Sequence, residues 1–155
     1  MIDAATRAAY LRTIVTVDLG DGWLAACEAA RALGSVIHVL TAWNPRQARP
    51  SIGENRAAND RLRDEFDRRR IAYYPALGSS PAGDHAEESF AVVGIDRVMA
   101  CEFGRMFEQA AIFEITHVRQ TVVSADRDWE VPARRWAPTD SSQTACPAPD
   151  WKYVL

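Results

Sequence analysis

Polar side chains that could hold a small ligand gather just after an apolar segment in the first third of the chain. Residues 36–40 read Val-Ile-His-Val-Leu, and residues 41–45 continue as Thr-Ala-Trp-Asn-Pro. Asn55 and Asn59 follow at a spacing that puts both amides on one face of a helix. Burying an amide without partners costs about 1–3 kcal/mol, so inward-facing asparagines need a ligand, a backbone group or each other.

Residues 41–45 therefore predict a pocket for a small polar or nucleotide-like ligand, beside the N-terminus of a helix over residues 52–70. In α/β sheets, ligands bind where the carboxyl end of a strand meets a helix N-terminus, because free N–H groups point there. Arg46 or Arg49 would neutralise an anionic group. The side chains expected to contact the ligand are Thr41, Asn44, Asn55, Asn59, Ser89 and Gln109.

The same asparagines also have a structural interpretation. Asn44 would form a turn before the proline that follows it, while Asn55 and Asn59 would attach the loop to the helix. Glu54 would reach back to Ser51 in a capping box, and its negative charge would oppose an anion at that helix N-terminus. Both interpretations stay open at this stage.

Glu88 is the candidate for a catalytic role. Alternation along residues 88–94 puts it on one face with Phe90 and Val92. If the strand is covered on both faces, apolar surroundings would raise the pKa of Glu88 and suit a general base. The alternative, which such strand ends favour, is a carboxylate bonded to a loop amide or to an arginine.

Cysteines and histidines predict neither a metal site nor a cofactor. The three cysteines are widely spaced and form no C-x-x-C pair, and the three histidines are scattered. Phosphate-loop, dinucleotide and nucleophile-elbow motifs are absent. Arg97 and Arg105 flank Cys101 at helical spacing and would lower the pKa of its thiol, although most single cysteines are unreactive.

Length and charge narrow the class of protein. The chain has 155 residues, of which 48% are hydrophobic and 25% charged, values typical of one folded domain. A formal net charge of −3 gives no attraction to phosphate backbones, which makes nucleic-acid binding an unfavoured function. No stretch approaches the roughly 20 apolar residues of a membrane span, and no signal peptide is visible, so we expect a cytoplasmic protein without a membrane partner.

The elements that position these side chains begin with a strand over residues 13–19 and an alanine-rich helix over residues 23–33 that ends at Gly34. A second apolar strand follows over residues 36–42. This order predicts a βαβ unit with parallel pairing. The helix over residues 52–70 then directs Leu62 and Phe66 inward.

The second half predicts two hairpins with a helix between them. Strands are expected over residues 71–77 and 88–94, and over residues 110–116 and 120–124. Asp96 caps the intervening helix, whose core face would be Met99, Phe103 and Met106. The predicted fold class is α/β or α+β: a single-domain sandwich with a mixed sheet of about five to six strands and about three helices.

Periodicity disappears after residue 125, so we divide the chain into a mixed domain over residues 1–125 and an irregular strap or tail over residues 126–155. Prolines exclude regular structure there, yet Trp129, Trp136 and Trp151 are unusual for a disordered tail. The alternative function is therefore a protein-interaction or regulatory module that binds a partner through this tail.

Five short motifs in the chain resemble those of the bacterial family named domain of unknown function 3293. In order, they are T-A-W-N-P, E-N-x-x-x-N-x-x-L, Y-Y-P-A-L-G, E-E-S-F-x-V-x-G and F-x-Q-A-A-I-F. The resemblance covers roughly residues 10–113 and implies a module without an established reaction. His85, at a position where the family has an aromatic residue, and Glu108 before Gln109 depart from the pattern. Signature positions fall on Thr41, Asn44, Pro45, Asn55, Asn59, Gly78, Glu88, Ser89, Phe107 and Gln109.

Overall fold

The computed structural model describes residues 2–135 of the chain. These residues contain a short 3-10 helix, η1 (Pro45–Gln47), and four α-helices: α1 (Ala4–Arg12), α2 (Ala26–Leu33), α3 (Ile52–Arg69) and α4 (Arg97–Met106). They also contain eight strands: β1 (Ile14–Asp18), β2 (Trp23–Ala25), β3 (Ile37–Leu40), β4 (Ala72–Ser79), β5 (Ala86–Val93), β6 (Ala111–Ile115), β7 (Arg119–Ser124) and β8 (Glu130–Arg135).

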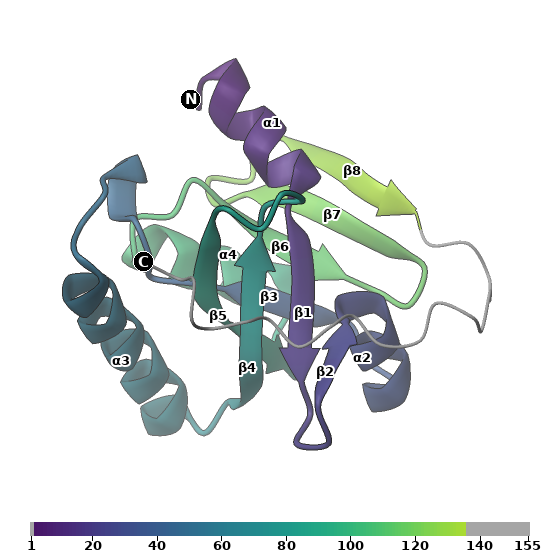
Figure 1. Cartoon of the computed structure of the whole chain (residues 1–155). Coiled ribbons are helices and arrows are strands. Elements are labelled where there is room, and N and C mark those ends of the chain that lie inside the picture. The colour runs from purple at the N-terminus through teal and green to yellow at the C-terminus, as the bar shows by residue number, and fades with distance from the viewer. Residues whose placement is uncertain (1, 136–155) are drawn as a thin grey trace.

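All eight described strands form one sheet in the order β2-β1-β4-β5-β3-β6-β7-β8. Every neighbouring pair is antiparallel. The sheet curls strongly, so β1 and β4 run across the direction of β6 and β7 (Figure 1). The fold is mixed α+β, as one of the two predicted classes states, but the predicted mixed sheet is wrong, because all the pairs are antiparallel. The predicted numbers of strands and helices are too low, because β2, β8 and α1 were not expected.

The predicted parallel βαβ unit is wrong. The turn at residues 20–22 closes a hairpin, so Trp23–Ala25 pairs with β1 instead of beginning the helix. β4 occupies the other edge of β1. Both neighbouring positions of β1 are therefore filled, and β3 pairs with β5 and β6 in the middle of the sheet.

Strand β8 contradicts the expectation that prolines exclude regular structure beyond residue 125. Pro132 lies opposite Thr121, next to a register shift between β7 and β8. At such an irregularity in an edge strand, a missing N–H disturbs the ladder least. Trp136 and Trp151 of the predicted interaction tail lie outside the described residues, and the division of the chain near residue 125 stays a prediction.

Signals at the helix ends are confirmed. The Glu54 N–H donates to Ser51 Oγ at 3.2 Å and the Ser51 N–H donates to the Glu54 carboxylate at 2.8 Å, so the capping box is complete. Asp96 caps α4 by accepting a hydrogen bond of 2.8 Å from a backbone N–H in its first turn. The predicted core face of α4 is right for Phe103 and wrong for Met106, which is 49% exposed.

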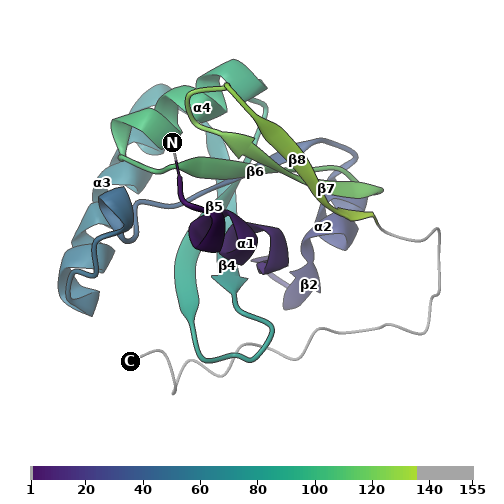
Figure 2. The same ribbon diagram turned by 90° about the horizontal axis from the view of Figure 1, so that it is seen from above.

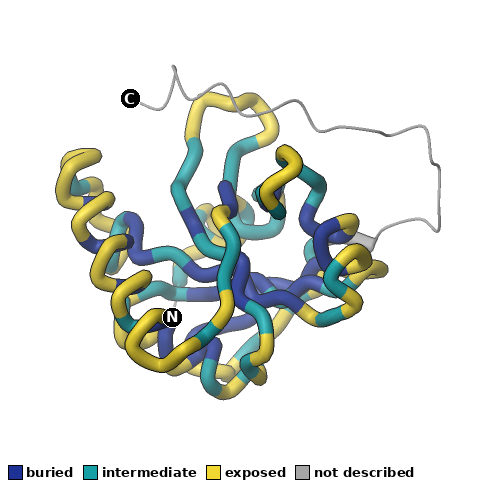
Figure 3. The backbone as a smooth tube through the Cα atoms, turned by 90° about the horizontal axis from the view of Figure 1, so that it is seen from below, coloured by how far each residue is buried: buried dark blue, intermediate teal, exposed yellow. Residues whose placement is uncertain are grey.

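Helices cover both faces of the sheet. One hydrophobic cluster lies on the face covered by α1 and α2, and a second lies between the opposite face and α3 and α4. β3 serves both clusters, since Ile37 and Val39 point to the first and Leu40 to the second. Figure 2 looks down on α1, and Figure 3 shows the buried residues gathered in the central strands. No helix within residues 2–135 is long and apolar enough to cross a membrane.

Candidate functional site

Asn59 on α3 holds the chain where it leaves β3. Its side-chain oxygen accepts a hydrogen bond from the Ala42 N–H at 2.8 Å, and its NH₂ group donates to the Glu88 carbonyl at 2.7 Å. The Thr41 hydroxyl donates to the same carbonyl at 2.8 Å. Asn59 is buried, and both ends of its amide are satisfied by the chain itself. One amide thus ties the loop after β3 to the start of β5.

Asn55, one helical turn earlier, holds the next part of the loop. The Asn44 N–H donates to Asn55 Oδ1 at 2.9 Å, and Asn55 Nδ2 donates to Asn44 Oδ1 at 3.1 Å. Asn44 has a left-handed backbone with φ 49° and ψ 51°, a conformation that asparagine tolerates better than most residues. The two buried asparagines of α3 therefore fix the shape of the loop, as the structural interpretation of the sequence expects.

The Asn44 side chain, itself held by Asn55, in turn fixes the orientation of a carboxylate. Asn44 Nδ2 donates to Glu87 Oε1 at 2.6 Å. His85 Nε2 lies 3.1 Å from the same oxygen. Because both contacts reach Oε1, the carboxylate of Glu87 is held in one orientation from two sides. Hydrogen bonds from Asn55 through Asn44 to Glu87 therefore link α3, the loop and β5.

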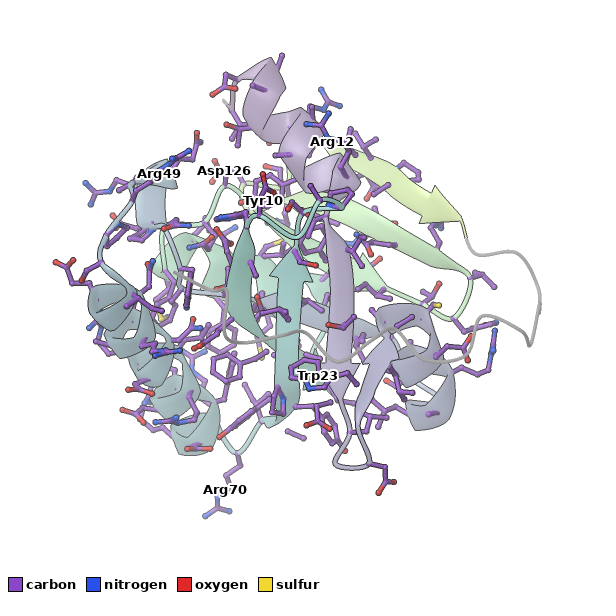
Figure 4. The ribbon with its side chains drawn as sticks, viewed as in Figure 1. Tyr10, Arg12, Trp23, Arg49, Arg70 and Asp126 are labelled. Carbon is purple, nitrogen blue, oxygen red and sulfur yellow. The ribbon has the colours of Figure 1, made fainter. Side chains whose placement is uncertain are left out.

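Glu87 lines a cavity of about 520 Å³ between α1, the loop after β3 and the loop between β4 and β5. Apolar side chains on its wall include Val39, Leu40 and Phe113. In Figure 4, Tyr10 lies below α1 at the end of β4 and β5, with Arg49 and Arg12 to either side of it in that view. The lining residues with polar groups in their side chains are Thr6, Tyr10, Arg12, Thr13, Thr41, Trp43, Asn44, Gln47, Arg49, Ser79, Ser80, His85, Glu87, Ser89 and Gln109.

Tyr10 keeps its proton at all ordinary pH values. Burial, and next the negative charge of Glu87, raise the pKa of Tyr10 to about 12, against an opposing hydrogen bond with the Ala111 backbone. Its ring lies 5.9 Å from that of Phe113, centroid to centroid. Tyr10 therefore offers the cavity an aromatic surface and a neutral hydroxyl.

His85 is the titratable group on the wall that responds near neutral pH. The hydrogen bond with Glu87 raises the pKa of His85, while burial and the charge of Arg49 act in the opposite direction. His85 remains well exposed, with 61% of its side chain accessible. A protonated His85 would partly neutralise Glu87, so the charge of this wall depends on pH.

The loop between β3 and α3 is held in an uncommon backbone shape. Arg46 and Gln47, like Asn44, have positive φ angles of 52° and 60°. Arg46 forms an ion pair with Glu108, and Gln47 accepts a hydrogen bond of 3.0 Å from Thr6. Such left-handed residues cost of order 1 kcal/mol each, and the surroundings must enforce them. Here the contacts with α1 and with the segment after α4 do so.

The predicted ligand residues separate into two groups. Thr41, Asn44, Ser89 and Gln109 line the cavity, whereas Asn55 and Asn59 stand behind the loop. Several of the first group already have partners. Gln109, for example, donates to the Trp43 carbonyl at 2.8 Å, and the Ser89 hydroxyl donates to the Glu87 carbonyl at 3.1 Å. Contact of these side chains with a ligand stays a prediction.

Two residues on the cavity wall are absent from the ligand residues predicted from the sequence, Tyr10 and Glu87. The strand pattern singles out Glu88 and not Glu87, and Tyr10 lies on a helix that the sequence pattern does not predict. Arg49 was foreseen as a partner for an anion and does line the cavity, whereas Arg46 is engaged by Glu108. The signal that could have found Glu87 is its short spacing from His85, which brings an imidazole and a carboxylate together at the start of β5.

Glu88, the catalytic candidate, lies on the other face of β5. It pairs with Arg56 of α3 at 2.9 Å and is not among the residues that line the cavity. This is the arrangement that the alternative interpretation describes, a strand-end carboxylate bonded to an arginine. No arrangement observed here brings Glu88 to the cavity, and a role for it as a base stays a prediction.

The N-terminus of α3 does not open onto the cavity. The carboxylate of Glu54 accepts hydrogen bonds from both the Ser51 N–H and the Ser51 hydroxyl, each at 2.8 Å, and places a negative charge at this helix end. The cavity wall ends at Arg49 on this side. Any ligand in the cavity would therefore meet the loop and not the helix terminus.

The remaining titratable clusters lie elsewhere. His38 contacts Glu114 at 3.2 Å, and Glu114 also binds Arg97 on the α4 side of the sheet. Burial raises the pKa of the Cys101 thiol despite the nearby arginines, so the expectation of a lowered value is wrong. Within residues 2–135, no group of three or more histidine, cysteine or acidic side chains is arranged to hold a metal ion.

Comparison with known protein families confirms the resemblance read from the motifs. The family described as "Protein of unknown function (DUF3293)" matches residues 40–112. The matched segment runs from the end of β3 into β6 and contains the loop, the asparagines of α3 and Glu87. Tyr10 and α1 lie outside it. No curated protein and no solved structure matches the chain.

Proposed function

With residues 40–112 belonging to this family of proteins of unknown function, we propose from the geometry of the cavity that the protein binds a small polar ligand there. A volume of about 520 Å³ suits a compact metabolite or a nucleotide-like compound. The wall combines an apolar surface with a few fixed polar groups, the usual character of a small-molecule site.

One observation carries the proposal: the carboxylate of Glu87 is oriented at the cavity by a relay of asparagines. Asn55 holds Asn44, and Asn44 donates to Glu87 Oε1 at 2.6 Å. Binding sites rely on side chains whose orientation is fixed before the ligand arrives, because this lowers the entropy lost on binding. The strained loop that carries Asn44 supports the same conclusion.

A thermal-shift screen of the purified full chain tests the proposal. The panel contains nucleotides, amino acids and other small polar metabolites. A ligand present at about 100 times its dissociation constant should add about 2.7 kcal/mol of stability, which raises the melting temperature by roughly 5–10 °C. Hits are then titrated by calorimetry to obtain stoichiometry and affinity.

A pair of tryptophan variants on α1 locates the binding site. Ala5 and Ala9 are both exposed on α1, but only Ala9 lines the cavity, so Ala9→Trp places a large ring at the cavity wall and Ala5→Trp places the same ring away from it. We expect the first variant to abolish the shift and the second to retain it, with similar melting temperatures for both without ligand. A hit that survives in Ala9→Trp would place binding elsewhere and refute the proposal.

A further inference from the structure

The carboxylate of Glu87 has one occupied and one unoccupied oxygen. Both neighbouring donors, Asn44 Nδ2 at 2.6 Å and His85 Nε2 at 3.1 Å, reach Oε1. No hydrogen bond within residues 2–135 reaches Oε2. A carboxylate accepts hydrogen bonds at both oxygens, so Glu87 retains capacity for a further donor. With 27% of its side chain exposed, it is partly withdrawn from water.

The cavity wall carries a negative side chain that is partly buried and positive side chains that are exposed. Glu87 is the one acidic side chain among the described residues that line the cavity, and it sits partly buried. Arg12 and Arg49 line it from exposed positions, Arg12 at the end of α1 and Arg49 just after η1. Arg49 is close enough to His85 to oppose protonation of that imidazole. A single opening therefore presents an anion inside and a cation near the mouth.

We propose that the cavity takes a small zwitterion, with a protonated nitrogen on Glu87 Oε2 and an anionic group beside Arg49 at the mouth. This inference rests on the proposed function and names its ligand class. A protonated nitrogen supplies the donor that Oε2 lacks, in a charge-assisted hydrogen bond. The aromatic wall of Tyr10 and Phe113 adds attraction for a cation near the rings.

Ligands with one charge fit less well. A simple cation would satisfy Glu87 but would meet the like charge of Arg49 at the mouth. A simple anion would pair with Arg49 but would leave Glu87 and its negative charge facing the same ligand. The zwitterion satisfies both groups, and the apolar wall between them accommodates its carbon framework.

A matched series of probes tests this inference by calorimetry on the full chain. The series is 4-(aminomethyl)benzoate, benzylamine and 4-methylbenzoate, which share one ring and differ in the two charged groups. We expect 4-(aminomethyl)benzoate to bind most tightly, by about tenfold or more over either analogue, as for loss of one charge-assisted hydrogen bond. Equal affinities, or tighter binding of 4-methylbenzoate, would overturn the inference.

Two variants test whether the amine of 4-(aminomethyl)benzoate contacts Glu87 and whether its carboxylate contacts Arg49. Glu87→Gln keeps an oxygen for Asn44 but removes the charge. In this variant, 4-(aminomethyl)benzoate should no longer bind more tightly than 4-methylbenzoate, but should still bind more tightly than benzylamine. In Arg49→Gln, 4-(aminomethyl)benzoate should no longer bind more tightly than benzylamine, but should still bind more tightly than 4-methylbenzoate. Glu88→Gln is the matched control, because it removes the same charge from the neighbouring residue on the opposite face of β5. An amine advantage that persists in Glu87→Gln would refute the assignment.

The failure of this inference can be told apart from failure of the proposed function. If a probe of any charge binds and Ala9→Trp abolishes that binding, the cavity is a ligand site. A preference for an anion in that case refutes only the zwitterion. If Ala9→Trp leaves the binding of every probe and of every hit from the metabolite screen unchanged, both proposals fail together.

Discussion

Asn44 and Asn55 hold each other by two hydrogen bonds that run in opposite directions. The Asn44 backbone N–H donates to the Asn55 side-chain oxygen at 2.9 Å, and the Asn55 NH₂ group donates back to Asn44 Oδ1 at 3.1 Å. This exchange leaves Asn44 Nδ2 free to donate to Glu87. The orientation of an amide on α3 thereby determines where a carboxylate on β5 sits.

Replacing Asn55 with alanine should destabilise the protein. The change removes both hydrogen bonds and leaves the Asn44 N–H without its acceptor, at a cost of about 1–3 kcal/mol. Urea unfolding of Asn55→Ala against wild type measures the free energy of unfolding. Arg61→Ala, an exposed position of the same helix, is the control and should change stability by less than about 0.5 kcal/mol. Equal stability of Asn55→Ala and wild type would show that the loop keeps its shape without the exchange.

Short-range patterns predicted much of the local structure, because their causes lie within a few residues. The Ser51–Glu54 capping box and the inward position of Asn55 and Asn59 depend only on helical spacing. Strand pairing is different. The neighbour of β3 depends on which edges of β1 are already filled, and β4 fills one of them from more than fifty residues away. The residues around β3 do not indicate that β4 pairs with β1.

The candidate site was predicted in part for the same reason. The position of the loop follows from the end of a strand, but Glu87 and Glu88 point to opposite faces of β5 by alternation. Which face meets a cavity depends on α1, and the low amphipathic contrast of Ala4–Arg12 gave no sign of a helix that packs there. The sequence pattern therefore predicts Glu88 as the carboxylate of the site, while Glu87 is the one that lines the cavity.

Two helical glycines should respond in opposite ways to alanine. At Gly104 of α4, an added Cβ would lie 3.0 Å from Ile112 Cγ2 and 3.2 Å from Ala125 Cβ, tighter than most Cβ contacts in proteins, so these neighbours would have to shift. At Gly53 of α3, the nearest atom would be 4.0 Å away. Gly104→Ala should cost about 1–3 kcal/mol, whereas Gly53→Ala should gain up to about 1 kcal/mol.

Denaturant unfolding of the two glycine variants in parallel checks this pair. Both changes replace a helical glycine, Gly53 in the first turn of α3 and Gly104 in the last turn of α4, so a loss of stability confined to Gly104→Ala reports the packing conflict there. If Gly104→Ala were as stable as Gly53→Ala, the contact between α4 and β6 would have to be looser than the distances indicate.

Tyr10 should titrate late. With its pKa raised to about 12, about a tenth of Tyr10 would be ionised at pH about 11, against about nine tenths of an ordinary tyrosine. Between pH about 10 and 12, the unfolded chain releases a proton that folded Tyr10 keeps, so folding stability falls as the pH rises. The tyrosinate absorbance of wild type minus that of Tyr10→Phe measures this directly. A difference that appears already near pH 10 would mean that Tyr10 is open to water.

His38 should make the protein less stable in mild acid. Burial lowers the pKa of His38 below 6.5 in spite of its contact with Glu114. Below pH about 6.5 the unfolded chain therefore gains a proton that folded His38 does not, and stability falls by at most about 1.4 kcal/mol per pH unit. His85 acts oppositely, since its raised pKa adds stability as the pH falls, a gain that levels off below pH about 6.5. The lowered pKa of Glu114 stabilises the folded protein above pH about 4.5, and this stabilisation is lost only as the pH falls further. Urea unfolding at pH about 6.5 and 5 should show this slope in wild type and in the exposed-position control His117→Gln. The slope should vanish in His38→Gln, and its survival there would assign the effect to another group.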